Sequence, residues 1–357
     1  MSLNKKKNII YLYSEVMPYA IAVMRSLAQE FDVQVDCICW DENKRTPFVP
    51  VDEAGIYFHK RSAFNKTSIL QFIEGRSPAI IYVVGRMDKL YLHAAASFKG
   101  KYPVVSGCDN QWLGTAKQKL ATYFSYLLYR RYFDFFWVPG RRQYDFARRM
   151  GYNNGRIIPH FLTADTAVFG SIYEQNKQVK KDHYPHTIVY AGRFAPTKGV
   201  DLLIQAFAEV KNEIENDWQL ILVGSGDLPH TDRPFIKAQP FMQGPQMALE
   251  CRHWGVFCLP SIYEPWGVVI HEFTMAGLPV ICSDSVGADA LVINNYNGFV
   301  FKSGDKGQLK NAIIDVMNKS DEELQAMGAR GHELSEMHSP VIAAYSLMSI
   351  LQQGKDQ

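Results

Sequence analysis

Two carboxylates and two cations stand beside predicted strands, at spacings that could hold a charged ligand. In "EPWGVVIHEFTMAGLPVICSD", Glu264 precedes a helical run and Glu272 lies inside it, eight residues later. In "YAGRFAPTKGVDLLIQAF", Arg193 ends a strand and Lys198 lies at the mouth of a helix, five residues later. Carboxylates accept hydrogen bonds from hydroxyl groups, and cations bind phosphate. The two pairs together suit a diphosphate with a sugar on each side.

Backbone groups near these side chains favour the same ligand. Gly267 and Val268 would present N–H groups at the start of a helix, where anions bind. Gly192 and Gly224 follow two strands, and glycine lets a backbone approach a ligand closely. Ordinary explanations stay open for each feature: solvated loop charges, a helix cap at the first carboxylate, and a solvated or paired second carboxylate.

Several other kinds of site are unsupported by the sequence. The G-x-G-x-x-G fingerprint of nicotinamide cofactors is incomplete after Gly224 because Pro229 replaces its third glycine. None of the six cysteines forms C-x-x-C, which favours reduced core thiols. The chain contains no D-x-D, so no metal bound through that motif is expected, and we find no nucleic-acid motif.

These residues must be positioned by alternating strands and helices. Apolar runs typical of buried strands alternate with amphipathic runs in both halves of the chain, which predicts an α/β protein with parallel sheets. The expected strands lie near residues 8–13, 32–40, 79–85, 102–107, 135–140, 187–193, 218–226, 254–261, 278–284 and 297–301. A length of 357 residues favours two domains, predicted at 1–165 and 166–338. Residues 160–186 read as a linker, since "SIYEQNKQVKKDHYPH" lacks periodicity.

Composition and charge narrow the class of protein. Apolar residues make up 47% of the chain, yet no run approaches the 18–20 or so residues of a membrane span, and the first apolar run is too short for a signal peptide. We therefore expect a cytoplasmic protein. Residues 1–160 hold 23 Lys and Arg against 13 Asp and Glu, a net +10, and the remainder carries −8. This asymmetry suggests different partners for the two domains.

The motifs together resemble glycosyltransferase family 4. The residues that carry the resemblance, from about 187 to 319, are "GR…KGVDLLIQAF", "ILVGSGD", "PFMQG" and "PSIYEPWGVVIHEFTMAGLPVICSD…NGFVF", with E-x7-E the strongest element. The resemblance implies a GT-B fold, in which two Rossmann-like domains face each other across a cleft. It also implies a retaining transferase, and a C-terminal helix, 339–357, that packs back on the first domain.

The resemblance further implies roles for single residues. Arg193 and Lys198 would hold the donor diphosphate and stabilise the departing nucleoside diphosphate in place of a metal. Glu264 would bind the hydroxyls of the donor sugar, and Glu272 those of the ribose. The donor-binding backbone would include Gly192, Gly224, Gly267, Val268 and, bordering the base, the loop 241–244 with Gln243 and Gly244. The nucleotide sugar is a co-substrate, so no cofactor is expected.

The N-terminal half resembles the family only in its alternation and position. Its first loop, "YSEVMPYA", lacks the glycines that the family often carries there. Where the family often places a catalytic-site histidine, this chain reads "VVSGCDNQWLG", which makes Asp109 a candidate catalytic residue or the cap of a turn. His93, on an apolar helical face, is a second candidate or a packed side chain.

Residues 115–150 point to the acceptor side. They hold eight Lys and Arg, two Asp and many aromatic residues. Such a mixture suits an anionic membrane surface or a lipid-diphosphate acceptor, although much of "LLYRRYFDFFWV" also reads as helix and core strand.

The resemblance thus implies a metal-independent, retaining hexosyltransferase-like enzyme. It would move sugar from a nucleoside-diphosphate sugar to a glycan or glycolipid acceptor in surface polysaccharide biosynthesis, such as lipopolysaccharide or capsule. An epimerase of similar architecture and a non-catalytic nucleotide-sugar-binding scaffold are the alternatives. Donor base, donor sugar, acceptor and oligomeric state cannot be read from the sequence.

Overall fold

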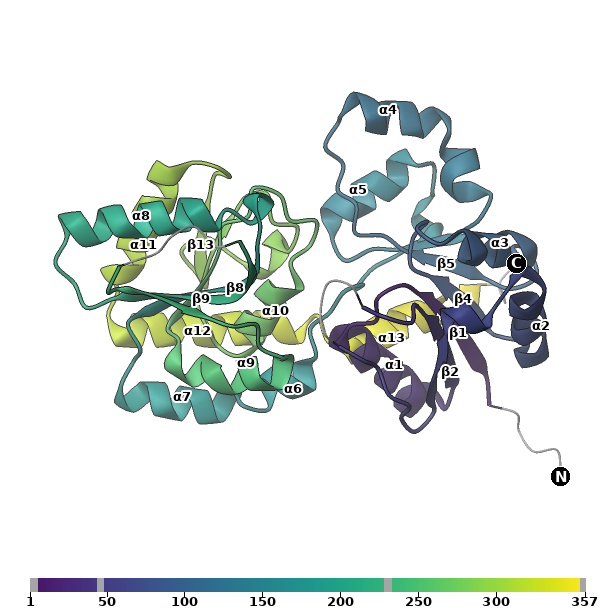
Figure 1. Cartoon of the computed structure of the whole chain (residues 1–357), viewed down its shortest axis with the longest axis horizontal. Helices are drawn as coiled ribbons and strands as arrows, with labels where there is room; N and C mark the ends of the chain where they lie inside the picture. Colours follow the sequence, from purple (N-terminus) through teal and green to yellow (C-terminus); the bar gives the residue numbers. More distant parts are fainter. Residues whose placement is uncertain (1–5, 44–47, 228–232, 354–357) are drawn as a thin grey trace. The chain divides into compact units, whose positions relative to one another are not determined.

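The computed structural model describes residues 6–43, 48–227 and 233–353, and the chain divides into two compact units (Figure 1). The first unit comprises residues 1–163 with 340–357, and the second comprises residues 164–339. Pro229 and the end of the predicted C-terminal helix, 354–357, lie outside the described residues. None of the described helices is both long and apolar enough to cross a membrane.

The first unit is built on a parallel sheet with the order β3-β2-β1-β4-β5-β6-β7. Its strands are β1 (Asn8–Tyr13), β2 (Gln34–Cys39), β3 (Ile56–Lys60), β4 (Ile80–Val83), β5 (Val104–Gly107), β6 (Phe135–Trp137) and β7 (Ile157–Ile158). The central strands β1 and β4 are buried along their whole length, because helices cover both faces of such a sheet.

Helices pack around the sheet of this first unit. They are α1 (Pro18–Phe31), α2 (Lys66–Arg76), α3 (Lys89–Phe98), α4 (Ala116–Tyr123), α5 (Arg141–Arg149), α13 (Pro340–Met348) and α14 (Ile350–Gln353), with the short turns η1 (Arg61–Ala63), η2 (Tyr126–Arg130) and η3 (Asn154–Arg156). Helix α1 begins at Pro18, whose fixed φ suits the first turn.

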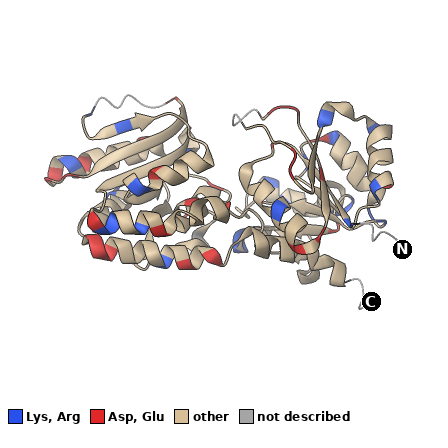
Figure 2. Cartoon of the chain, turned by 90° about the horizontal axis from the view of Figure 1, so that it is seen from below, with Lys and Arg blue, Asp and Glu red and all other residues tan. Residues whose placement is uncertain are grey.

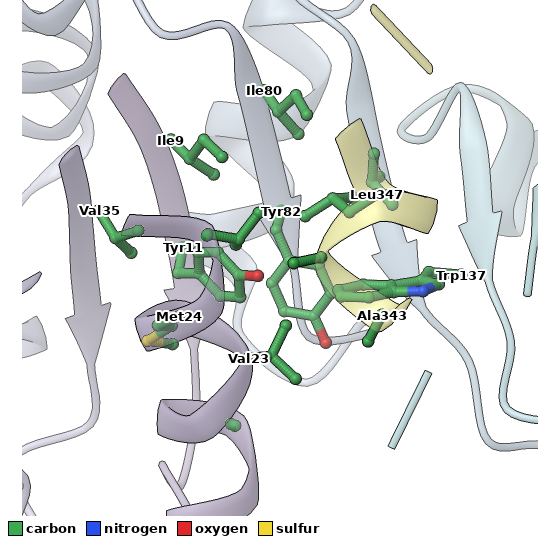
Figure 3. Packing of buried hydrophobic residues seen from close by; sticks show 14 of the residues in the cluster. Ile9, Tyr11, Val23, Met24, Val35, Ile80, Tyr82, Trp137, Ala343 and Leu347 are labelled. Atoms are coloured by element: carbon green, nitrogen blue, oxygen red, sulfur yellow. The ribbon is translucent and has the colours of Figure 1, made fainter. Parts of the chain in front are cut away.

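The C-terminal helix α13 belongs to the core of the first unit. It lies beside α1, and its Ala343 and Leu347 share one apolar cluster with Val23 of α1 and with Tyr11 and Tyr82 of the sheet (Figure 3). Each large side chain buried in this way contributes about 1.5–3 kcal/mol. Helix α13, near the end of the chain, therefore helps to stabilise the sheet whose strand β1 begins at Asn8.

The second unit repeats the same sheet topology with one strand fewer. Its order is β10-β9-β8-β11-β12-β13, and neighbouring strands are parallel. The strands are β8 (Thr187–Phe194), β9 (Gln219–Gly226), β10 (Ile236–Gln239), β11 (Val256–Leu259), β12 (Val280–Ser283) and β13 (Gly298–Phe301). The direction of winding reverses between β8 and β11, where doubly wound sheets bind ligands.

Helices cover both faces of this second sheet. They are α6 (Thr166–Gly170), α7 (Tyr173–Asp182), α8 (Val200–Glu213), α9 (Gly244–Glu250), α10 (Val268–Met275), α11 (Lys306–Met317) and α12 (Asp321–Glu336), with η4 (Pro196–Lys198), η5 (Cys251–His253) and η6 (Asp289–Leu291). Basic and acidic residues are mixed along the outer helices of this unit (Figure 2).

The predicted linker within 160–186 is wrong in part, because α6 and α7 occupy much of it. The buried face of α7 consists of Tyr173, Asn176 and Lys180. Two of these three side chains are polar, so the helical period is invisible to a search for apolar residues. Burial lowers the pKa of Lys180 to about 8.

The stretch 115–150 separates into a core part and a surface part. Phe133, Phe135, Phe136 and Trp137 are buried in the sheet region, whereas α4 and η2 contain no buried residue. The aromatic residues of β6 are therefore core residues, whereas α4, η2 and the exposed arginines of α5, Arg141, Arg148 and Arg149, belong to the surface.

Candidate functional site

Most of the second-unit residues that could bind a ligand or take part in chemistry line one pocket at the carboxyl ends of β8, β9 and β11. Its volume is about 260 Å³. Seven of the residues predicted from sequence line it: Gly192, Lys198, Gly224, Glu264, Gly267, Val268 and Glu272. The pocket lies at the reversal of the winding, the position expected for a ligand site in a doubly wound sheet.

A larger open groove of about 800 Å³ lies in the first unit. It runs along the amino ends of β5, β6 and β7, and Lys101, Arg148 and Arg156 are among its lining residues. Parallel sheets bind ligands at the opposite, carboxyl edge. We therefore place the candidate site in the smaller pocket, where anion-binding and hydroxyl-binding groups occur together.

Two glycines keep the floor of the pocket open. Gly192 of β8 pairs with Gly224 of β9, and a Cβ atom at Gly224 would lie 1.8 Å from the carbonyl oxygen of Gly192. No side chain fits at that position. The strand ends consequently present bare backbone to a ligand.

A third glycine sets the position of Lys198. Gly199 has φ 65°, and a Cβ there would lie 2.2 Å from the carbonyl oxygen of Pro260. The loops that carry Lys198 and Glu264 are joined by a backbone hydrogen bond, in which the Ile262 N–H donates to the Thr197 carbonyl at 2.9 Å. The tight packing of these two loops brings a cation and a carboxylate together.

Lys198 and Glu264 form an ion pair inside the pocket. Their side chains are only 18% and 13% exposed. The backbone of Glu264 is held as well, because the Gly287 N–H donates to its carbonyl at 3.0 Å. Both side chains of this partly desolvated pair are therefore already in position when a polar ligand enters the pocket.

Helix α10 begins at the pocket. Gly267, with φ 94°, is its N-cap, and no side chain caps the helix. The positive end of the helix dipole and the first N–H groups thus face the ligand space beside Val268. Such a terminus binds an anion such as phosphate.

Glu272 lines the same pocket from the second turn of α10. Its pKa is raised to about 7, first because burial disfavours the charged form and second because Asp165 carries like charge. Asp165, which caps α6 through the Val168 N–H at 3.3 Å, was not among the residues predicted from sequence. The only signal for it was an acidic residue ahead of a short helix.

The wall beyond Glu272 is largely apolar. Phe241, Met242, Met247, Val223 and Val269 line it, and Phe241 is 40% exposed. A flat apolar wall suits the face of an aromatic base. The loop predicted to border a base thus contributes through Phe241 and Met242, while Gln243 and Gly244 are not among the lining residues.

Arg193 and Asp109 are not among the lining residues of the pocket. Arg193 is exposed at the end of β8, where its carbonyl accepts a hydrogen bond from the Tyr190 hydroxyl at 2.7 Å. Asp109 is exposed in the first unit, on the loop after β5, and its carbonyl accepts from Gln143 Nε2 at 3.4 Å. The catalytic roles of both residues, and that of His93 on α3, stay predictions.

His271, next to Glu272, is a structural residue. Its Nδ1 accepts from the Ala164 N–H at 2.9 Å, and its Nε2 lies 3.0 Å from the Ser335 carbonyl. Burial lowers its pKa to about 3, so the ring is neutral at physiological pH. It anchors α10 to α12 and thereby fixes the helix that carries Glu272.

Within the described residues, no group of three or more His, Cys, Asp or Glu is placed to hold a metal ion. All six cysteines are buried and free, in agreement with the sequence interpretation.

Comparison with known proteins finds a family model and relatives that are similar to this region. Residues 171–334 match the family model described as glycosyl transferases group 1. The phosphatidyl-myo-inositol mannosyltransferase of Mycobacterium leprae is 27% identical over 176 residues, 46% of this chain and 47% of that protein. The capsular polysaccharide biosynthesis glycosyltransferase CapM of Staphylococcus aureus is 27% identical over 42% of this chain and 41% of its own length. In both cases the match spans less than half of the relative.

Solved structures match almost the whole chain. HepE from Anabaena, in complex with UDP-glucose, superposes with a TM-score of 0.69 at 16% identity, covering 98% of this chain and 100% of that one. Sucrose-phosphate synthase from Thermosynechococcus elongatus gives a TM-score of 0.74 at 15% identity, covering 98% and 99%. At this level of identity the likeness is one of fold, and it confirms the predicted architecture of two doubly wound domains.

Proposed function

We propose that this chain, a protein of GT-B fold whose second unit matches the family model of group 1 glycosyl transferases, transfers a sugar from a nucleoside-diphosphate sugar to a glycan or glycolipid acceptor. The observation that carries the proposal is the grouping of Lys198, Glu264 and Glu272 around the start of α10. The cation and the helix N-terminus suit a diphosphate, and the two carboxylates suit the sugars on either side of it.

The proposed division of labour follows from charge. When the anomeric bond breaks, negative charge grows on the leaving diphosphate and positive charge on the sugar. Lys198, the α10 N–H groups and Arg193 would stabilise the former. Glu264 would accept hydrogen bonds from hydroxyls of the transferred sugar, and Glu272 would accept them from the ribose. Retention of the anomeric configuration is implied by the resemblance to family 4.

Metal independence is part of the proposal, because the cations would supply the charge that a divalent ion supplies elsewhere. Activity that survives EDTA would support it. Activity that EDTA abolishes and Mg²⁺ restores would contradict it.

The acceptor is proposed to be a growing glycan or a lipid-linked sugar in surface polysaccharide biosynthesis, and the reaction is proposed to occur in the cytoplasm. The proposed acceptor is supported by relatives named as a phosphatidyl-myo-inositol mannosyltransferase and as a capsular polysaccharide biosynthesis glycosyltransferase. Asp109 is the candidate acceptor-side group, because it lies exposed at the carboxyl end of β5. Asp109→Asn should lower transfer to an acceptor but leave the affinity for nucleotide unchanged.

Two alternatives use the same pocket. An epimerase would interconvert nucleotide sugars, and a scaffold would bind them without turnover. Thermal shifts with UDP, GDP, ADP, CMP and their sugars come first, because a ligand that binds only the folded state raises Tm. Release of free nucleoside diphosphate then identifies a transferase, sugar interconversion an epimerase, and a shift without either reaction a scaffold. A shift that persists unchanged in Lys198→Ala would contradict the proposed site.

A further inference from the structure

The first unit carries a cluster of outward-facing apolar side chains on and around α4 and η2. Its six members, which we call the α4–η2 surface, are between 50% and 86% exposed: Leu113, Leu120, Tyr123, Phe124, Tyr126 and Leu127. They fall within fifteen residues of chain. Contiguous exposed apolar groups of this kind mark sites of interaction rather than ordinary surface.

Contacts with the core of the first unit hold the α4–η2 surface in place. Neither α4 nor η2 contains a buried residue, but Ser125, between them, is 8% exposed. Tyr129, at the end of the segment, packs edge-on against Phe136 and Phe146, with ring centroids 5.5 and 6.1 Å away. The Arg86 guanidinium stacks over the same tyrosine ring at 4.4 Å. The segment is thus anchored to the core at one end while its apolar side chains face solvent.

The charged residues within this segment of chain are all of one sign. Between Asp109 and Asp134 the chain contains no acidic residue, but it contains Lys117, Lys119, Arg130 and Arg131. All four cations are exposed, and in the described part of the chain none of them has an ion-pair partner. The surface therefore combines apolar groups that prefer to leave water with unneutralised positive charge.

We infer that the α4–η2 surface docks on the anionic face of a lipid bilayer. Tyrosine and phenylalanine with leucine can enter the headgroup boundary while lysine and arginine meet lipid phosphates. Each basic residue near an anionic surface strengthens binding about fivefold. A second copy of the chain fits less well, because pairing this surface with itself would bring the four cations of each copy together.

Within residues 115–150, the membrane contact predicted from sequence is assigned here to α4 and η2. The aromatic residues of β6 are excluded because they are buried. The proposed docking also goes beyond the proposed function, since the donor pocket is lined by residues of the other unit. Docking would place the first unit at the site where a lipid-linked acceptor resides.

The test is flotation of the full-length protein with vesicles. Vesicles of phosphatidylcholine alone are compared with vesicles containing about 30% phosphatidylglycerol, at low and high salt. We expect binding to the anionic vesicles at low salt, at least about tenfold weaker binding at 0.5 M salt, and little binding to neutral vesicles. Protein that stays unbound with anionic vesicles at low salt would overturn the inference.

A triple variant with a matched control identifies the surface. Tyr123→Ser, Phe124→Ser and Leu127→Ser together should reduce vesicle binding by about tenfold or more. The control is Val49→Ser with Val51→Ser, which are 80% and 67% exposed elsewhere on the first unit and should bind as the wild type does. An equal loss in the control, or no loss in the triple variant, would overturn the assignment.

Two further measurements separate the explanations. The nucleotide-induced thermal shift should be the same in the triple variant and the wild type, so that failure of the donor site and failure of the membrane surface are distinguishable. Light scattering gives the oligomeric state. A wild-type dimer that the triple variant converts to monomer would assign the surface to self-association and overturn the lipid proposal.

Discussion

In the second unit the Lys198 ammonium and the Glu264 carboxylate form an ion pair, although 66 residues separate them along the chain. Each side chain holds the other in the pocket before a ligand arrives. Because both are partly desolvated, their interaction is stronger than that of an ordinary surface pair. A bound diphosphate would offer Lys198 a second anion and leave Glu264 free to accept hydroxyl groups.

Removing either member of this pair should abolish turnover. Lys198→Ala and Glu264→Gln are each expected to lower kcat by about a hundredfold or more, because charge developing at the leaving group or sugar loses its partner. Release of nucleoside diphosphate measures the rate. Lys306→Ala, which breaks the surface pair with Glu209, is the control and should leave kcat unchanged. Near-wild-type rates in either pocket variant would count against the site.

Glu272 should make stability depend on pH. Its pKa is about 7 in the folded protein against an ordinary value of 4.5, so between these values the folded state binds more protons than the unfolded state. Stability should therefore fall as pH rises from about 4.5 to 7, by at most about 3 kcal/mol. Glu272→Gln should remove this slope in a series of Tm measurements. His271, with a pKa of about 3, adds an opposing slope that both proteins share.

The same group should couple donor binding to pH. Only the ionised Glu272 accepts hydrogen bonds from two ribose hydroxyls at once, so the affinity for nucleoside diphosphate should increase about tenfold from pH 6 to pH 8. Calorimetric titration at several pH values measures this change. An affinity that is flat across this range in the wild type, or equally steep in Glu272→Gln, would exclude the role.

Gly224→Ala should be one of the more damaging single-methyl changes in the chain. The added Cβ would lie 1.8 Å from the Gly192 carbonyl oxygen, which is backbone and cannot rotate away. We expect a loss of about 1–3 kcal/mol in the free energy of unfolding together with weaker nucleotide binding. Gly75→Ala is the control: it lies exposed in α2 with nothing within 4 Å of the added atom, and should stabilise by about 0.5–1 kcal/mol. Equal effects at the two glycines would refute the argument.

Leu347→Ala should weaken the sheet of the first unit. Leu347 is fully buried in the cluster that α13 shares with α1 and β1, and such a cavity costs about 2–5 kcal/mol. Hydrogen exchange of the β1 and β4 amides localises the effect to this unit. Leu120→Ala removes an equal side chain that is 60% exposed, so it should leave those amides as protected as in the wild type.

Much of the architecture was readable from local patterns. The apolar runs at β1 and β8 and the amphipathic run at α8 predicted strands and helix at nearly the positions observed. The predicted boundary at 165–166 lies two residues from the observed division of the chain. Elements whose buried face is partly polar were not predicted from the sequence. Helix α7 is an example, because Asn176 and Lys180 form part of its buried face.

By itself, the sequence determined the alternation of elements, the E-x7-E spacing and the basic character of the first half, because each depends on residues close together along the chain. Only the tertiary structure decided that Lys198 faces Glu264, that Asp165 raises the pKa of Glu272, and that Tyr123 is exposed while Trp137 is buried. Those relationships join residues on different strands and helices. They are set by which faces pack together, and packing is a property of the whole fold rather than of any local stretch.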